Sequence, residues 1–169
     1  MLNFAPQFQI EKNMIQRKQT IFLLLVVIAS VISFFFPLAS FIGAKDSVIL
    51  FVEKANSLVP GSTFNQNGYF SLPLLSATGF VMLFSLITIF FYKNRKVQMQ
   101  IIKVCILVEV AFIGLFFLYY VDFLQKLTGG TAEYKTAVFM PLISLVFLVL
   151  AYRGVLQDER LIRSADRLR

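Results

Sequence analysis

The chain has 169 residues, of which 58% are hydrophobic and 15% are charged, and its formal net charge is +7. Soluble domains average roughly 45 to 50% apolar and about 25% charged residues, so this composition is typical of an integral membrane protein. One cysteine and no histidine are present. These counts exclude an intrachain disulfide, histidine-based triads and histidine-ligated zinc or haem, and we expect no metal and no cofactor.

Four long apolar segments predict four transmembrane helices. Residues 20–44 contain no charged side chain, and neither do residues 70–92. A helix rises 1.5 Å per residue, so about 20 such residues cross a hydrocarbon core about 30 Å thick. The first run exceeds the roughly 7 to 15 apolar residues of a signal peptide, which favours a retained span. The third and fourth spans are predicted at residues 101–121 and 136–152.

These spans divide the chain into three parts. Residues 1–19 are polar to mixed and net positive, which indicates a cytoplasmic lead-in; whether translation starts at Met1 or Met14 stays open. Residues 20–152 form the predicted four-helix transmembrane domain. Residues 153–169 form a charged cytoplasmic tail.

The loop from Lys45 to Tyr69 contains more than linker residues. The run from Val48 to Val52 is rich in strand-forming residues, and Asn67-Gly68 is a hairpin signal. Val48, Phe51, Val52 and Ala55 also fit a helical stripe, so strand and helix both stay open. We therefore expect a partly ordered outer loop between the first two helices.

Two further breakers mark the ends of helices. Pro37 is expected to kink or end the first helix near Phe36, because proline cannot donate the helical hydrogen bond. Gly129-Gly130 is expected to break the second outer connection, Asp122 to Lys135.

The distribution of basic residues predicts the orientation. Cytoplasmic flanks of spans carry the excess of Lys and Arg. With the lead-in, the turn at residues 93–103 and the tail on one side, that side carries twelve Lys and Arg residues, against four on the other. The sequence therefore predicts that both the N-terminus and the C-terminus are inside.

Glu109 is the only ionisable residue well inside a predicted span. A carboxyl there costs several kcal/mol unless it is protonated, paired or hydrated. It is either a proton or cation site or a structural carboxyl that binds hydroxyls across the bundle, and we favour the structural role. The candidate hydroxyl partners are Ser30, Ser33, Ser85, Thr88 and Ser144. Cys105, four residues earlier, is interpreted as a packing residue rather than an acylation site.

The cytoplasmic ends carry a mixed-charge face that suits anionic lipid or a partner protein. Its candidate residues are Lys93, Arg95, Lys96, Asp158, Glu159, Arg160, Arg163 and Arg167. Because basic flanks of spans explain the net charge, we expect membrane lipid and a membrane or cytoplasmic protein as partners, and no nucleic acid.

Three stretches resemble a known bacterial family. They are Met14 to Arg17 with Gln19-Thr20, Tyr92 to Lys96 with Gln98, and Asp158-Glu159 with Arg163 to Arg169. Together they are similar to the domain of unknown function 4293, typical of Bacteroidota. The resemblance implies a four-helix inner-membrane protein with no assigned activity, and it supplies no catalytic or binding residues.

The sequence therefore predicts an all-α protein of the bacterial inner membrane, with four transmembrane helices packed as a bundle. It contains no Walker loop, no dinucleotide fingerprint and no nucleophile elbow. We expect a non-enzymatic accessory or scaffold subunit of a membrane assembly. The alternative is a small transporter or channel component that uses Glu109.

Overall fold

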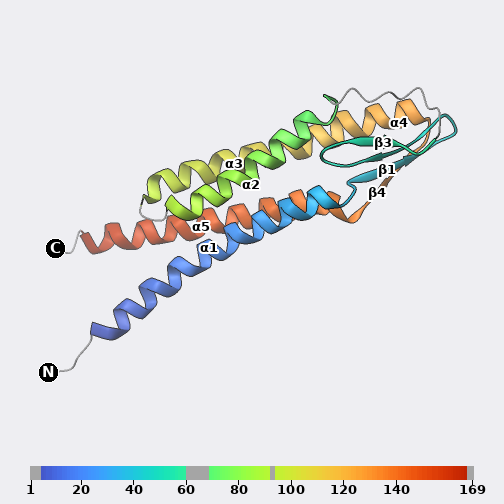
Figure 1. Ribbon diagram of the computed structural model, residues 1–169. Coiled ribbons are helices and arrows are strands. Elements are labelled where there is room, and N and C mark those ends of the chain that lie inside the picture. The colour runs from blue at the N-terminus through green and yellow to red at the C-terminus, as the bar shows by residue number, and fades with distance from the viewer. Residues whose placement is uncertain (1–4, 60–68, 92–93, 167–169) are drawn as a thin grey trace.

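The computed structural model describes residues 5–59, 69–91 and 94–166, and in these the chain forms a long helical bundle with a small sheet at one end (Figure 1). The elements, in chain order, are α1 (Ala5–Phe35), β1 (Ala39–Ile42), β2 (Ser47–Leu50), β3 (Ala55–Ser57), α2 (Leu72–Phe90), α3 (Arg95–Leu115), the π-helix η2 (Phe116–Val121), α4 (Asp122–Thr128), β4 (Thr131–Tyr134), the 3-10 helix η3 (Thr136–Phe139) and α5 (Met140–Asp166).

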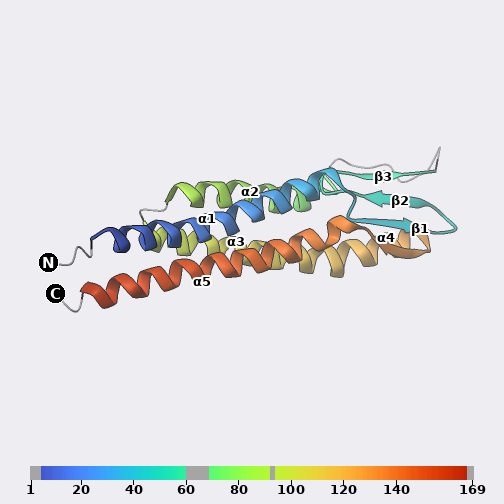
Figure 2. The same ribbon diagram turned by 90° about the horizontal axis from the view of Figure 1, so that it is seen from below.

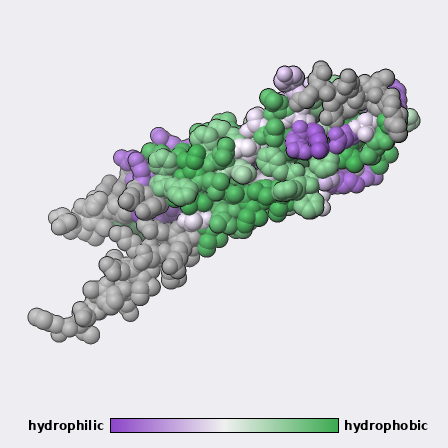
Figure 3. Space-filling model, in the orientation of Figure 1, coloured by the Kyte–Doolittle hydropathy of each residue, from purple (hydrophilic) through white to green (hydrophobic). Residues whose placement is uncertain are grey.

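Three of the helical segments are long and apolar enough to cross a membrane. They are Leu72–Phe90, the continuous rod Arg95–Thr128 and Thr136–Leu161; the part of α1 at Gln19–Phe35 is apolar but shorter. Large side chains such as Leu83, Leu107 and Val146 are more than half exposed on their outer faces. Figure 3 shows this hydrophobic surface over the middle of the bundle, with hydrophilic patches towards the ends. Lipid is the solvent that suits such a surface, which indicates a multi-pass membrane protein.

The start of α1, the turn between α2 and α3 and the end of α5 lie together at the end opposite the sheet (Figures 1 and 2). We call this the inner end and the sheet end the outer end. α1 packs along α5, α5 along α3, and α2 against both α1 and α3. The bundle is therefore antiparallel, with its connections at alternate ends.

The sheet corrects the all-α prediction. Its four strands are antiparallel in the order β3-β2-β1-β4. β1 pairs with β2 in a hairpin, and β1 also pairs with β4, with Ala39 opposite Tyr134 and Ile42 opposite Thr131. The strand alternative for the loop after the first helix is therefore correct, and the helical stripe is wrong. The predicted turn at Asn67-Gly68 lies outside the described residues.

The predicted boundaries need correction at three places. The first helix ends at Phe35, so residues 39–42 of the predicted span 20–44 are a strand; Pro37 ends the helix, as expected. The third helix begins before residue 101 and continues to Thr128, which replaces the connection predicted to start at Asp122. α5 continues to Asp166, so the residues after the predicted span 136–152 are helical to that point.

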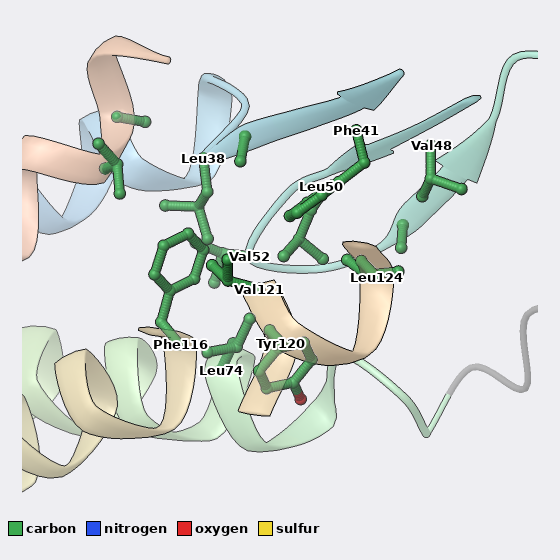
Figure 4. Close-up of a cluster of buried hydrophobic side chains, with 14 of the residues drawn as sticks. Leu38, Phe41, Val48, Leu50, Val52, Leu74, Phe116, Tyr120, Val121 and Leu124 are labelled. Carbon is green, nitrogen blue, oxygen red and sulfur yellow. The ribbon is translucent and has the colours of Figure 1, made fainter. Parts of the chain in front are cut away.

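A hydrophobic cluster joins the sheet to the helices (Figure 4). Phe41, Val48 and Leu50 of the sheet are completely buried against Leu124 of α4 and Phe116 of η2, among others. Full burial of one such side chain stabilises a fold by about 1.5 to 3 kcal/mol in water. The sheet is therefore a packed unit fixed to the outer end of the bundle.

Two close backbone approaches fix the turn before β2 against the turn before β4. A Cβ atom on Gly43 would lie 2.1 Å from the carbonyl oxygen of Thr128, and one on Gly130 would lie 1.9 Å from that of Ile42. Gly129 ends α4 in the left-handed conformation, with φ 67°. The Gly129-Gly130 break was therefore predicted correctly. Gly129 is needed for its left-handed backbone conformation, whereas Gly130 is needed because a side chain there would collide with the backbone of Ile42.

An exposed ion pair at the end of β4 makes the stability of the sheet depend on pH. Lys135 donates a hydrogen bond of 2.9 Å to Glu133 and lowers the pKa of that carboxyl, and Ser40 donates to the same oxygen at 3.4 Å. The ionised carboxyl therefore stabilises the sheet above its unfolded pKa of about 4.3. This stabilisation is lost as the pH falls through the lower pKa that the carboxyl has in the folded protein.

We expect Glu133→Gln to remove this loss of sheet stability at acid pH. The stability at neutral pH should change little, because the ion pair is solvent-exposed. Hydrogen exchange of the β1 and β4 amides, followed as the pH is lowered, measures it in both proteins. Equal acid-side slopes in the two proteins would contradict the assignment.

Candidate functional site

The buried side chains of α2 and α3 form one stripe along each helix, facing the interior of the bundle. On α3 the buried residues follow steps of three and four, and α2 repeats the same steps on its facing side. The buried residues on α3 are Gln98, Ile102, Cys105, Glu109 and Phe112, and those on α2 are Leu74, Thr78, Val81, Ser85 and Thr88. The periodicity of one face thus places polar side chains inside the bundle.

Glu109 lies in this interior, where it is 6% exposed. The hydroxyl of Ser144 on α5 lies next to the Glu109 carboxyl, and that of Ser85 on α2 lies next to the thiol of Cys105, one helical turn away. Neither contact has good hydrogen-bond geometry. Three helices therefore bring a carboxyl, a thiol and two buried hydroxyls into one region of the interior; we call Ser85, Glu109 and Ser144 the interior site.

The other three predicted hydroxyl partners are satisfied within their own helices. Ser30 donates to the carbonyl of Val26 at 3.0 Å, Ser33 donates to Ala29 at 3.1 Å, and Thr88 donates to Phe84 at 2.5 Å. Such bonds to the preceding turn are the usual alternative for a hydroxyl inside a helix. Of the five predicted partners, Ser144 lies beside the acid, and Ser85 lies beside Cys105, one helical turn away.

A second polar cluster joins three helices at the inner end. Gln19 of α1 donates a hydrogen bond to the carboxylate of Asp158 on α5, and Arg95 of α3 donates to the Asp158 carbonyl oxygen at 2.9 Å. Gln19 is 7% exposed and Asp158 is 5% exposed. A Cβ atom on Gly154 would lie 2.9 Å from Cγ of Gln19. Gly154 therefore leaves the room that Gln19 needs.

This cluster changes the predicted docking face. Asp158 is buried, so it holds helices together rather than facing a partner, whereas Lys96 and Arg160 are exposed and Glu159 is partly buried. Lys93 and Arg167 lie outside the described residues, and the side chain of Arg163 is likewise not described. The exposed part of the face is therefore smaller than predicted.

The sequence reasoning missed Gln19, Gln98 and Gly154. Gln98 is 4% exposed and donates to the carbonyl of Thr88 at 3.4 Å. The burial of Gln98 could have been predicted, because Gln98, Cys105 and Glu109 are spaced by seven and four residues and so share one helical face. Gln19 had a weaker signal, since it lies beside the basic lead-in and looked like part of it.

The side chains of both clusters interact through hydrogen bonds. Among the described residues, no three His, Cys, Asp or Glu side chains lie together as ligands for a metal ion.

The comparison with protein families covers nearly the whole chain. A family model described as Domain of unknown function (DUF4293) matches residues 15–168. The chain belongs to this family. The resemblance noted in its sequence is therefore confirmed, and the family's description assigns no activity to its members. No curated protein gives a significant match.

Proposed function

We propose that this DUF4293 protein is a non-enzymatic accessory or scaffold subunit of an assembly in the bacterial inner membrane. It crosses the membrane four times, with α1 as the first span and with both the N-terminus and the C-terminus in the cytoplasm. The observation that carries the proposal is the packed sheet at the outer end. A folded unit fixed to a transmembrane bundle presents a defined surface to another protein, which short loops do not.

The orientation is supported by charge and by the position of the ends. The start of α1, the α2–α3 turn and the end of α5 lie at one end, so a single membrane orientation accounts for the basic residues near all three (Figure 1). α1 runs beside α5 and reaches the same outer end. The sheet is then periplasmic.

Labelling of single cysteines tests this orientation. In a Cys105→Ser background, we expect Thr131→Cys to react with a membrane-impermeant maleimide in intact spheroplasts. Lys96→Cys should react only after the membrane is opened, because both positions are exposed but at opposite ends. The reverse pattern would show that the inner end faces the periplasm.

Purification in a mild detergent tests the subunit role. We expect a stoichiometric partner to copurify, and Thr131→Arg on the exposed side of β4 to weaken its binding, because the sheet is the surface that the proposal assigns to the partner. Lys96→Glu, which changes an exposed lysine at the inner end, is the matched control. A chain that purifies alone as a monodisperse species, with no cross-linked partner in native membranes, contradicts the proposal.

A second candidate is a small transporter or channel component, favoured by the buried position of Glu109 between α2, α3 and α5. Purified protein in liposomes would then pass ions, and Glu109→Gln would abolish the flux while the protein stays folded. Absence of flux in the parent protein argues against this candidate and leaves the subunit role in place.

A further inference from the structure

Two basic side chains lie at one level on neighbouring helices near the inner end. Lys103 is the last basic residue before the apolar part of α3, and Arg153 is the first charged residue after the apolar part of α5. The two helices pack along each other, and the Nζ atom of Lys103 lies 5.5 Å from the centre of the Tyr152 ring. Because Tyr152 directly precedes Arg153, the two cations are placed together where α3 meets α5.

Neither of these cations has an acidic partner in the part of the chain that the structure describes. The acid of α3, Glu109, is buried inside the bundle, and α5 contains no Asp or Glu between residues 136 and 157. Asp158 is also buried, and its carboxylate accepts a hydrogen bond from Gln19. The ion pairs among the described residues lie at the outer end. Two exposed positive charges are therefore left uncompensated by protein.

The surface beside these cations, towards the middle of the bundle, is apolar. Leu107 follows Lys103 by four residues on α3, so the two side chains share one face of that helix. Leu150 and Val146 precede Arg153 by three and seven residues and share its face of α5. All three apolar side chains are exposed. Each helix therefore presents a cation at the end of an apolar strip, which matches a molecule with a charged headgroup and hydrocarbon chains.

We propose that Lys103 and Arg153 bind the phosphate of an anionic phospholipid in the leaflet at the inner end. An ammonium and a guanidinium both donate charge-assisted hydrogen bonds to phosphate oxygens, and the guanidinium can donate two in parallel. The ring of Tyr152 holds the ammonium of Lys103 against α5 by a cation–π interaction. The acyl chains lie along the two apolar strips. This inference is independent of the subunit role.

The level of the two cations favours a lipid over a soluble anion. Lys96 and Arg160 are also exposed, but each lies seven residues nearer the inner end, on the order of 10 Å further from the apolar surface. A soluble anion would bind there as readily, whereas Lys103 and Arg153 adjoin the apolar surface, where lipid phosphates lie. Two uncompensated cations also favour a lipid of net negative charge over a zwitterionic one.

Native mass spectrometry of the full chain in detergent tests the site. The probes are phosphatidylglycerol, which is anionic, and phosphatidylethanolamine with the same acyl chains. We expect one phosphatidylglycerol to bind at lower concentration than phosphatidylethanolamine. Lys103→Gln and Arg153→Gln should each weaken its binding about fivefold, because each removes one basic residue near the lipid surface. Lys103→Arg should retain the binding. Both side chains are exposed, so the variants should fold as the parent does, which circular dichroism checks.

Lys96→Gln and Arg160→Gln are the matched controls, because each removes one exposed positive charge further from the apolar surface. They should leave the binding of phosphatidylglycerol unchanged. Equal binding of the two lipids by the parent protein overturns the proposal. An equal loss in the control variants also overturns it, because the attraction would then be diffuse. Displacement of the lipid by inorganic phosphate would show that these cations recognise a free anion instead.

Discussion

Replacing Gly130 with alanine is expected to detach the sheet from the end of the bundle. The new Cβ would lie 1.9 Å from the carbonyl oxygen of Ile42 and 2.5 Å from Cα of Gly43, both backbone atoms of the facing turn. Since backbone cannot rotate away as a side chain can, the two turns must separate. We expect a loss of about 3 kcal/mol or more in the stability of the outer end.

Hydrogen exchange resolved by peptide measures this effect where it occurs. In Gly130→Ala the amides of β1 and β4 should exchange much faster, whereas those of α5 beyond Leu148 should keep their protection. Gly79→Ala is the matched control, because its Cβ would meet no heavy atom within 4 Å. Alanine is the better helix former, so that variant should be unchanged or more stable by up to about 1 kcal/mol. Equal protection of β1 in both variants would show that the turns can move apart freely.

The helices were predictable from the sequence because their signal is local. An apolar run of sufficient length has few alternatives in a membrane, and the charges that end each run are visible in the sequence. Pro37 also gave the end of α1 to within a residue. The sheet was different, because residues 39–42 are as apolar as the lipid-facing residues before them. Residues 39–41 are buried against protein instead, and composition does not distinguish these two environments.

The pairing of β1 with β4 could not have been predicted by such reasoning. Each strand has four residues, and β4 follows α4, which extends the third helix beyond the predicted end of its span. The two strands meet because α3, η2 and α4 form one rod of 34 residues, about 50 Å long, that reaches past the apolar belt. The length of that rod depends on where a helix stops in water, which hydropathy does not give.

For the interior site, the sequence found the acid but not the choice among its partners. Glu109 was identifiable because a lone carboxyl within an apolar span is costly. Which hydroxyls face it depends on the rotation of three helices and on whether each hydroxyl already bonds its own helix. Ser30, Ser33 and Thr88 each bond a carbonyl of their own helix.

Asp158 shows the opposite error, since it was assigned to a surface and is instead a buried connector. Its carboxylate accepts a hydrogen bond from Gln19, and its carbonyl accepts one from Arg95. We expect Asp158→Ala to cost about 1 to 3 kcal/mol, because it leaves the buried amide of Gln19 without its acceptor. Thermal unfolding in detergent, followed by circular dichroism, measures this loss.

The comparison with Asp122→Ala separates this contact from a general effect of removing an acid. Asp122 forms an exposed pair with Lys126 at 2.6 Å, and such pairs contribute at most about 0.5 kcal/mol. Gln19→Ala should destabilise the protein by a similar amount to Asp158→Ala, and the double variant should cost less than the sum of the two. Strict additivity would show that Gln19 and Asp158 stabilise the bundle separately. Non-additivity would show that one hydrogen bond joins α1 to α5 at the inner end.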